Sequence, residues 1–200
     1  APDGTVYVSF EGVARLLRYD RLDGTAENLP TPRAFTRFNR NAALEALAID
    51  DRGALYTFPE ELPGAKKLRL LVGQPGNPDG PDFPVWRFFK GNWTQPFTLG
   101  RRGSFLPVGA DFGPDSRLYV LERQFRGLGG FASRVRSFAL GPKGLEDERI
   151  VTESSPGMHD NLEGLSVWRD AAGHIRLTMV SDDNFLPILR TEIVEYLVKD

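Results

Sequence analysis

A tight turn followed directly by an apolar strand occurs four times along this chain of 200 residues. Each copy starts with Asp or Pro-Asp, reaches Gly or an equivalent small residue, and continues into a short apolar strand; the copies span residues 2–8, 51–57, 114–120 and 170–177. Asp followed by Gly supplies residues that tolerate positive φ, which a tight reversal between two short strands requires. The pattern predicts four β-hairpin turns.

Further strands surround these turns. We expect preceding strands at 46–49, 109–112 and 164–168 and following strands at 15–19, 84–88, 133–138 and 191–196, several of them alternating apolar with polar residues as half-exposed strands do. The turn positions Gly4, Gly53, Ser116 and Gly173 lie 49, 63 and 57 residues apart, close to the spacing of β-propeller blades with loop insertions. We predict one all-β domain, residues 1–200, with antiparallel propeller blades in units 1–40, 41–100, 101–158 and 159–200.

Two other interpretations stay open. A two-sheet sandwich also uses short strands joined by frequent turns. Residues 41–48 are good helix formers apart from Asn41, so their propensity favours a helix where the repeat favours a strand.

The first unit has no strand before its turn. We therefore expect an incomplete propeller that lacks its N-terminal blades, as part of a six-bladed ring. Open sheet edges expose unpaired backbone groups, which makes a homodimer through the blade edges a candidate assembly.

Composition narrows the function classes. The 21 glycines and 15 prolines favour short strands and turns over long helices. A net charge of −2 disfavours nucleic acid or an anionic membrane surface as a partner, and no apolar stretch approaches the length of a membrane span. Because the chain has no cysteine, a thiolate nucleophile and a cysteine-type zinc site are excluded.

An acidic residue follows the same strand in every unit, namely Glu11, Glu60, Glu122 and Asp182. Each lies four or five residues beyond the first apolar residue, about 16 Å along the strand at most. Equivalent strands run in the same direction, so these carboxylates are expected on one rim, with Asp183 beside Asp182. Such a ring attracts a hard cation such as Ca²⁺. The alternative is that each acid caps a turn or pairs with a nearby base, as Glu122 with Arg123 or Arg126.

A second set precedes the inner strands: Glu45, Asp160 and Glu163. Glu163 is expected either to face the axis with Asp182 or to accept N–H bonds from its own loop. His159, beside this loop, is a candidate general base, although a lone loop histidine often serves only as a hydrogen-bonding residue. The arginines 101, 102, 123 and 126 form either a phosphate clamp or solvated charge. Motifs of serine hydrolases, P-loop proteins and dinucleotide-binding proteins are absent from the sequence.

Four segments, Ser9-Phe10-Glu11, Leu121-Glu122-Arg123, 161–165 (Asn-Leu-Glu-Gly-Leu) and 181–185 (Ser-Asp-Asp-Asn-Phe), resemble the bacterial phytase-like family described as having esterase-like activity of phytase. The resemblance implies a propeller that is made with a signal peptide and exported to the periplasm or outside the cell. It also implies a hydrolase of carboxylic or phosphate esters that uses calcium.

Two functions follow as expectations. In the first, Ca²⁺ bound by Glu122, Asp182, Asp183 and Glu11 assists ester hydrolysis, with Glu163 and His159 as catalytic residues and Arg123 and Arg126 as substrate-binding residues. In the second, a non-catalytic propeller binds a ligand or a protein partner at the same rim, which needs no nucleophile or base.

Overall fold

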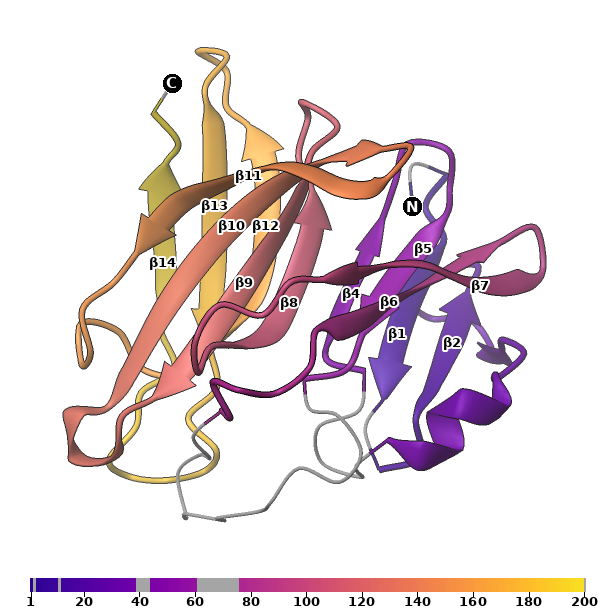
Figure 1. Cartoon of the computed structure of the whole chain (residues 1–200). Helices are drawn as coiled ribbons and strands as arrows, with labels where there is room; N and C mark the ends of the chain where they lie inside the picture. The colour runs from indigo at the N-terminus through magenta and orange to yellow at the C-terminus, as the bar shows by residue number, and fades with distance from the viewer. Residues whose placement is uncertain (2, 11, 39–43, 61–75, 200) are drawn as a thin grey trace.

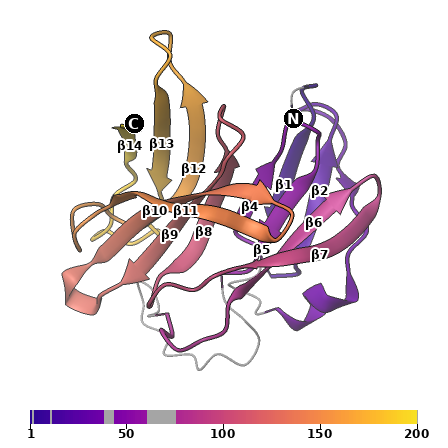
Figure 2. The same ribbon diagram turned by 45° about the horizontal axis from the view of Figure 1, so that its top comes forward.

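The computed structural model describes residues 1–200 except residues 2, 11, 39–43, 61–75 and 200. Its strands form four antiparallel sheets, which stand side by side in chain order from sheet 1 at one end to sheet 4 at the other (Figure 1, Figure 2). The prediction of an all-β fold of propeller blades is confirmed. Sheet 1 has β1 (Val6–Phe10), β2 (Arg15–Tyr19) and β3 (Glu27–Asn28); sheet 2 has β4 (Ala46–Ile49), β5 (Leu55–Phe58), β6 (Phe83–Phe89) and β7 (Asn92–Leu99); sheet 3 has β8 (Leu106–Phe112), β9 (Leu118–Phe125), β10 (Phe131–Gly141) and β11 (Gly144–Glu153); sheet 4 has β12 (Leu162–Arg169), β13 (Ile175–Ser181) and β14 (Ile193–Leu197).

The four repeated turns have the positive φ that their sequence predicts, and three of them join two strands as hairpins, whereas the turn at Gly4 precedes β1 with no described strand before it. Gly4, Gly53, Ser116 and Gly173 all have positive φ, between 61° and 91°. In sheets 2 and 4 an aspartate closes the turn: the Oδ1 atoms of Asp50 and Asp170 each accept backbone N–H bonds from residues two and four positions later. We call the edge of the molecule formed by these hairpin turns the turn rim and the opposite edge the loop rim.

The inner strands of consecutive sheets contact one another, β4 with β8 and β8 with β12, so these strands line the axis of the arc. β4 confirms the predicted strand at 46–49 and rules out a helix there, while 41–43 lie outside the described residues. In sheet 1, β1 pairs only with β2, so its inner edge has no partner strand among the described residues.

The core consists of three apolar clusters, one in each junction between neighbouring sheets. Leu16 of sheet 1 packs with Leu55 of sheet 2. Phe58 of sheet 2 packs with Val120 of sheet 3 in the next cluster, and Leu121 of sheet 3 with Leu177 of sheet 4 in the last. Successive residues of one strand therefore serve opposite junctions, as the two-residue period of a strand requires.

Two 3₁₀ helices, η1 (Arg33–Arg37) and η2 (Gly127–Gly129), complete the described elements. Within the described part of the chain, neither helix has the length or the apolar composition needed to cross a membrane.

Candidate functional site

Three sheets bring polar side chains together at the loop rim. Glu60 follows the end of β5 in sheet 2, Arg123 lies near the end of β9 in sheet 3, and Glu163 lies at the start of β12 in sheet 4. Strands β5 and β9 run toward the loop rim whereas β12 starts there. The three side chains therefore meet although 63 and 40 residues separate Arg123 from Glu60 and Glu163.

Arg123 is the centre of this cluster. Its Nη2 donates to Glu60 Oε1, and its Nη1 donates to Glu163 Oε1 and to Asn161 Oδ1. Asn161 Nδ2 in turn donates to Glu163 Oε1 at 2.8 Å. Glu60 is 3% exposed, Arg123 11% and Glu163 31%, so Glu163 is the member of this ion-paired trio that solvent reaches best. We call Glu60, Arg123, Asn161 and Glu163 the axial cluster.

Electrostatics separate the roles of the charged groups. The pKa of Glu163 is raised above its ordinary value, chiefly by burial and also by the neighbouring carboxylates of Asp182 and Glu60. The charge of Arg123 and the hydrogen bond from Asn161 lower this pKa but do not outweigh those effects. Burial opposes the charge of Arg123, but the carboxylates of Glu60, Glu163 and Glu45 outweigh it and raise the pKa of the guanidinium. Arg123 thus stays charged, whereas Glu163 is the carboxyl group that holds a proton more readily.

Asp182 and Asp183 differ in their surroundings. Asp182 is exposed, receives an N–H bond from Asn184 on Oδ1 and acts electrostatically on Glu163. Asp183 uses both oxygens inside its own loop, accepting from the Phe185 N–H and from the Thr191 hydroxyl. Asp182 therefore lies close to the axial cluster, and Asp183 stabilises the loop after β13.

Glu122 lies inside β9 and not past its end, so its expected position at the strand end is wrong. β9 has eight residues where β5 has four, which places Glu122, the fifth residue of β9, within the strand. Glu122 is fully buried, and its carboxylate accepts bonds from Arg134 Nε at 2.8 Å and Arg136 Nε at 2.9 Å. The expected pairing with a base holds, but with Arg134 and Arg136 instead of Arg123 or Arg126.

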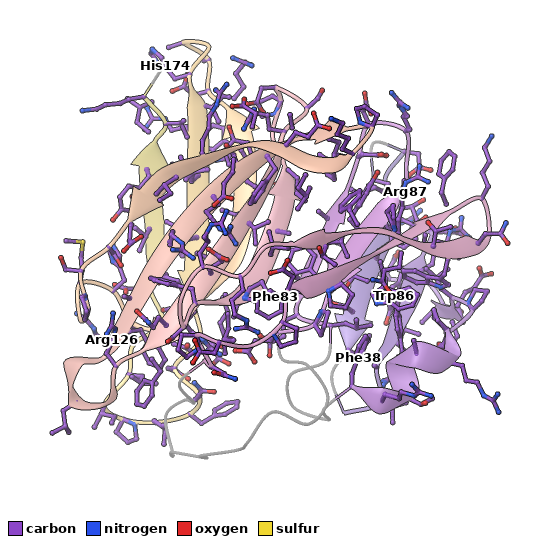
Figure 3. The ribbon with its side chains drawn as sticks, in the orientation of Figure 1. Phe38, Phe83, Trp86, Arg87, Arg126 and His174 are labelled. Atoms are coloured by element: carbon purple, nitrogen blue, oxygen red, sulfur yellow. The ribbon has the colours of Figure 1, made fainter. Side chains whose placement is uncertain are left out.

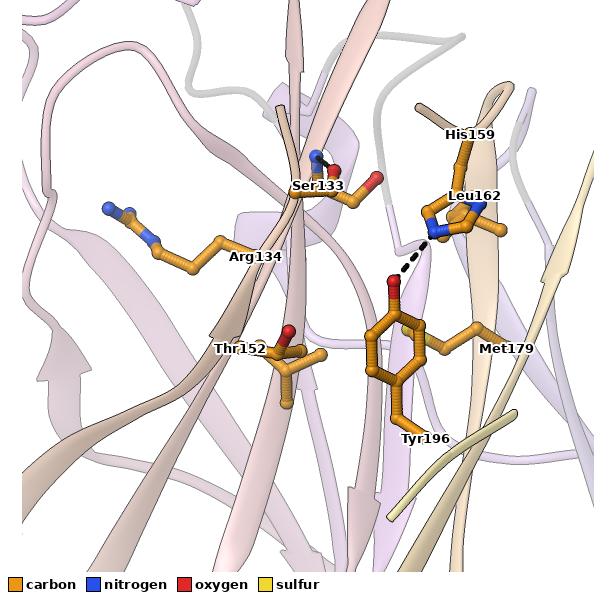
Figure 4. A pocket seen from close by; sticks show the side chains of 9 residues that line it. Ser133, Arg134, Thr152, His159, Leu162, Met179 and Tyr196 are labelled. Atoms are coloured by element: carbon orange, nitrogen blue, oxygen red, sulfur yellow. Dashed lines mark hydrogen bonds between the residues drawn. The ribbon is translucent and has the colours of Figure 1, made fainter. Parts of the chain in front are cut away.

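His159 contacts a different part of sheet 4 (Figure 4). Its Nε2 lies 2.7 Å from the Tyr196 hydroxyl, and its Nδ1 lies 3.7 Å from Glu192 Oε1. His159 and Tyr196 border a cavity of about 10 Å³ between sheets 3 and 4, room for about one water molecule. Hydrogen-bond contacts of His159 within the described residues do not include the axial cluster.

The four arginines do not form one clamp. Arg123 belongs to the axial cluster. Arg126 is exposed at the loop rim (Figure 3) and donates to Gln124 Oε1 at 2.8 Å. Arg102 pairs with Glu148, and Arg101 stacks on the ring of Phe83.

Of the four expected calcium ligands, Asp182 lies beside the axial cluster, Asp183 and Glu122 use their oxygens as described above, and Glu11 lies outside the described residues. Among the residues that the structure describes, no three His, Cys, Asp or Glu side chains converge as a metal site. The interacting charged groups at this site nevertheless comprise one guanidinium, that of Arg123, and four carboxylates, those of Glu45, Glu60, Glu163 and Asp182. This excess of negative charge matches the chemistry of a hard cation.

The sequence pattern predicts Asp182 at the rim and leaves Glu163 either facing the axis with Asp182 or bonded within its own loop. It does not indicate that Arg123 joins Glu163 to Glu60 and Asn161. The repeated acidic position after the second strand of each unit was the available signal for Glu60. For Arg123 the sequence has no such signal. The face of the sheet on which Arg123 lies depends on the irregular register between β8 and β9.

Four blade-like sheets, three of which contribute to the axial cluster, define a β-propeller with its candidate site at one mouth of the axis. The chain belongs to the phytase-like family, whose model, described as esterase-like activity of phytase, matches residues 1–185. No curated protein sequence matches the chain.

Several solved structures share the fold at low sequence identity. A gluconolactonase from Xanthomonas campestris is 22% identical with a TM-score of 0.53, over 97% of this chain and 58% of its own. An endo-arabinase from Bacteroides thetaiotaomicron is 12% identical with a TM-score of 0.57, over 97% and 70%. A chain of a nidogen–laminin complex is 14% identical with a TM-score of 0.51, over 96% and 57%. This chain thus spans less than two thirds of the length of the first and third.

Proposed function

We propose that this protein is an ester hydrolase in which Glu163 is the general base. Membership of the phytase-like family supports a hydrolase, and two of the propellers that share the fold, a gluconolactonase and an endo-arabinase, are named as enzymes. The observation that carries the proposal is the environment of Glu163 in the axial cluster.

The two oxygens of Glu163 have different partners. Oε1 accepts from Arg123 and Asn161, which fixes the plane of the carboxylate. Oε2 takes part in no hydrogen bond among the described residues, and the side chain is 31% exposed. An anchored carboxylate with one open oxygen and a raised pKa is suited to accept a proton from water. Arg123 acts as a positioning residue, since its two terminal nitrogens bind protein acceptors.

In the proposed reaction, Glu163 Oε2 removes a proton from a water molecule while the water oxygen attacks the ester. The water oxygen bonds to the carbonyl carbon and gives a tetrahedral intermediate; the bond to the leaving alcohol then breaks, and the protonated Glu163 returns its proton to the departing oxygen. General-base catalysis of this kind contributes about 10²–10⁴-fold to the rate.

Charge decides between the two ester classes. Four carboxylates against one guanidinium repel a phosphate group but leave a neutral carboxylic ester unaffected. We therefore propose carboxylic esters as the substrate in the absence of a cation. Calcium, when bound, would be held by Asp182 with water completing its shell, which leaves Glu163 Oε2 open, and it would polarise the ester oxygen and offset the negative charge.

Hydrolysis of p-nitrophenyl butyrate and p-nitrophenyl phosphate, with and without calcium, tests the proposal. We expect Glu163→Gln to lower kcat/KM for the butyrate ester by about 10²-fold or more and to remove the acidic limb of the pH profile. That limb lies above pH 4.5, because the folded protein raises the Glu163 pKa and the base acts only when deprotonated.

The matched control is Glu195→Gln, the same chemical change on an exposed side chain of β14. It should leave the rate and the pH profile unchanged. Equal activity in wild type and Glu163→Gln would contradict the role of Glu163. Hydrolysis of neither ester, under any calcium concentration, would favour the non-catalytic propeller that binds a ligand or partner.

A further inference from the structure

A groove of about 840 Å³ lies at the turn rim between sheets 2 and 3. Its walls come from residues 50–52 after β4, from β5, β6 and β7, from residues 112–117 between β8 and β9, and from the end of β10 at residues 139–141. This volume falls in the range of small-molecule sites. Tyr56 of β5 lines the groove, and Glu60 of the axial cluster follows the opposite end of the same strand, about 13 Å farther along. The groove is separate from the axial cluster.

Three aromatic rings line the groove. Tyr56 stacks with Phe97 at a centroid distance of 6.3 Å and an interplanar angle of 21°. Phe112 tilts against Tyr56 at 5.2 Å. Phe97 and Phe112 are only half-buried, so their rings give the groove an apolar wall that water reaches.

Arg87 presents an oriented cation in this groove. Its Nε donates to the Tyr56 hydroxyl at 3.0 Å, and that hydroxyl donates to Asp50 Oδ2 at 3.2 Å. The guanidinium also lies 4.6 Å from the centroid of Phe89. Figure 3 labels Arg87 on β6, toward the turn rim. The Tyr56 hydroxyl and the Phe89 ring thus hold the guanidinium, and its Nη1 and Nη2 atoms have no hydrogen-bond partner in the described part of the chain.

The other charges differ from Arg87 in their pairing. Arg117 and Arg149 both form ion pairs with Asp147. The lining aspartates 50 and 115 accept hydrogen bonds from the turn backbone and from Tyr56 or Tyr119. Arg87 and the exposed Arg52 make no ion pair with any described residue. Arg87 is the better placed of the two, because it lines the groove with Nε anchored and its two terminal nitrogens not bound to protein acceptors among the described residues.

We propose that this groove is a second ligand site, which binds a small molecule with an oxyanion on an aromatic body. The Nη1 and Nη2 atoms of Arg87 would bind two oxygens of a carboxylate or phosphate. Tyr56, Phe97 and Phe112 would cover the flat apolar part. The site stands on the turn-rim geometry alone and does not depend on hydrolysis at Glu163.

Calorimetric titration with four probes tests this site: benzoate, phenyl phosphate, inorganic phosphate and the neutral benzamide. We expect benzoate or phenyl phosphate to bind, with inorganic phosphate and benzamide at least about tenfold weaker. The better of the two aromatic anions identifies the oxyanion as carboxylate or phosphate. Arg87→Gln should weaken that probe by about tenfold or more, and Arg87→Lys should recover only part, because an ammonium cannot bind two oxygens side by side.

Further measurements test whether a loss of binding reflects misfolding and whether the probes bind at the axial cluster instead of the groove. Phe97→Ala, on the outer strand of sheet 2, should weaken the aromatic anion but leave inorganic phosphate unchanged. Glu163→Gln should bind the aromatic anion as wild type does, and Arg87→Gln should hydrolyse esters as wild type does. The proposal is overturned if no aromatic anion binds, if inorganic phosphate binds as tightly, or if binding survives Arg87→Gln.

Discussion

Glu122 and Arg136 are both fully buried in sheet 3, with relative exposures of 0%. Arg136 donates from Nε and Nη2 to the two oxygens of Glu122, and its Nη1 donates to Glu148 at 2.9 Å. Arg134 adds a second guanidinium on the Glu122 carboxylate. A buried pair like this contributes little over an apolar substitute, but loss of one partner leaves an uncompensated charge in the interior.

We expect Glu122→Gln to lower the free energy of unfolding by about 3 kcal/mol, because two buried guanidinium groups then face a neutral amide. Urea denaturation followed by circular dichroism measures the change. Glu153→Gln is the matched control, since Glu153 is 48% exposed and lies 3.9 Å from Arg134; its loss should stay below about 0.5 kcal/mol. Similar losses in both variants would show that burial of the Glu122 charge is not decisive.

The repeated hairpin turns are the elements in which local sequence and backbone agree best. Three of them use glycine at the position of positive φ, while Ser116 adopts φ 61° in the turn between β8 and β9. A residue with a Cβ atom in this left-handed region is strained, and no such cost applies to glycine. Ser116 is exposed and its hydroxyl makes no hydrogen bond within the described residues.

Replacing Ser116 with glycine should therefore stabilise the protein by about 0.5–1 kcal/mol. This is the net of two effects: the relief of backbone strain, and the opposing cost of glycine's greater conformational freedom in the unfolded chain. Thermal denaturation gives the comparison. Ser116→Ala keeps the Cβ atom and should not stabilise. An equal gain in Ser116→Ala would show that the hydroxyl, and not the backbone, causes the difference.

The inner and middle strands could be predicted because their apolar residues face two junctions. The outer strands β7 and β11 could not: β7 is mostly exposed and contains Pro96, and β11 is rich in acidic residues. The strand predicted at 133–138 is present as part of β10, but its alternation of apolar and polar residues is the pattern of a half-exposed strand. Arg134 and Arg136 are buried instead, because Glu122 on the neighbouring strand neutralises them. Such a pairing depends on strand register, which the sequence pattern does not contain.

At the scale of the whole molecule, each sheet has two faces, and at every junction one face of a sheet packs on the facing side of the next sheet in the chain. The two end sheets therefore keep one such face each without a cover among the described residues. On sheet 4 this free face includes the exposed side chains of Trp168, Val180, Ile193 and Leu197. On sheet 1, Leu16 faces the first junction, so the alternate residues Val8, Leu17 and Tyr19 form the other face. The free face of sheet 4 and the free face of sheet 1 are therefore of the same two kinds that pack against each other at the junctions within one chain.

We expect the chain to self-associate by placing sheet 4 of one copy on sheet 1 of another, a head-to-tail contact. Ile193→Glu should reduce the association measured by sedimentation equilibrium and change the free energy of unfolding by less than about 0.5 kcal/mol, since Ile193 is 74% exposed. Ile150→Glu, on the outer strand β11, should have no effect on association. A wild-type chain that stays monomeric at all concentrations would contradict this contact.

Arg123 gives the array of sheets a connection that a simple stack lacks. In repeat proteins each unit generally contacts only its neighbours, so unfolding can begin at one end and advance unit by unit. Here one guanidinium in sheet 3 binds carboxylates of both sheet 2 and sheet 4. Detachment of sheet 4 therefore also changes the charge balance that holds sheet 2. The last three sheets should consequently lose their structure in one cooperative step, while sheet 1, which contributes nothing to this bond, is free to fray first.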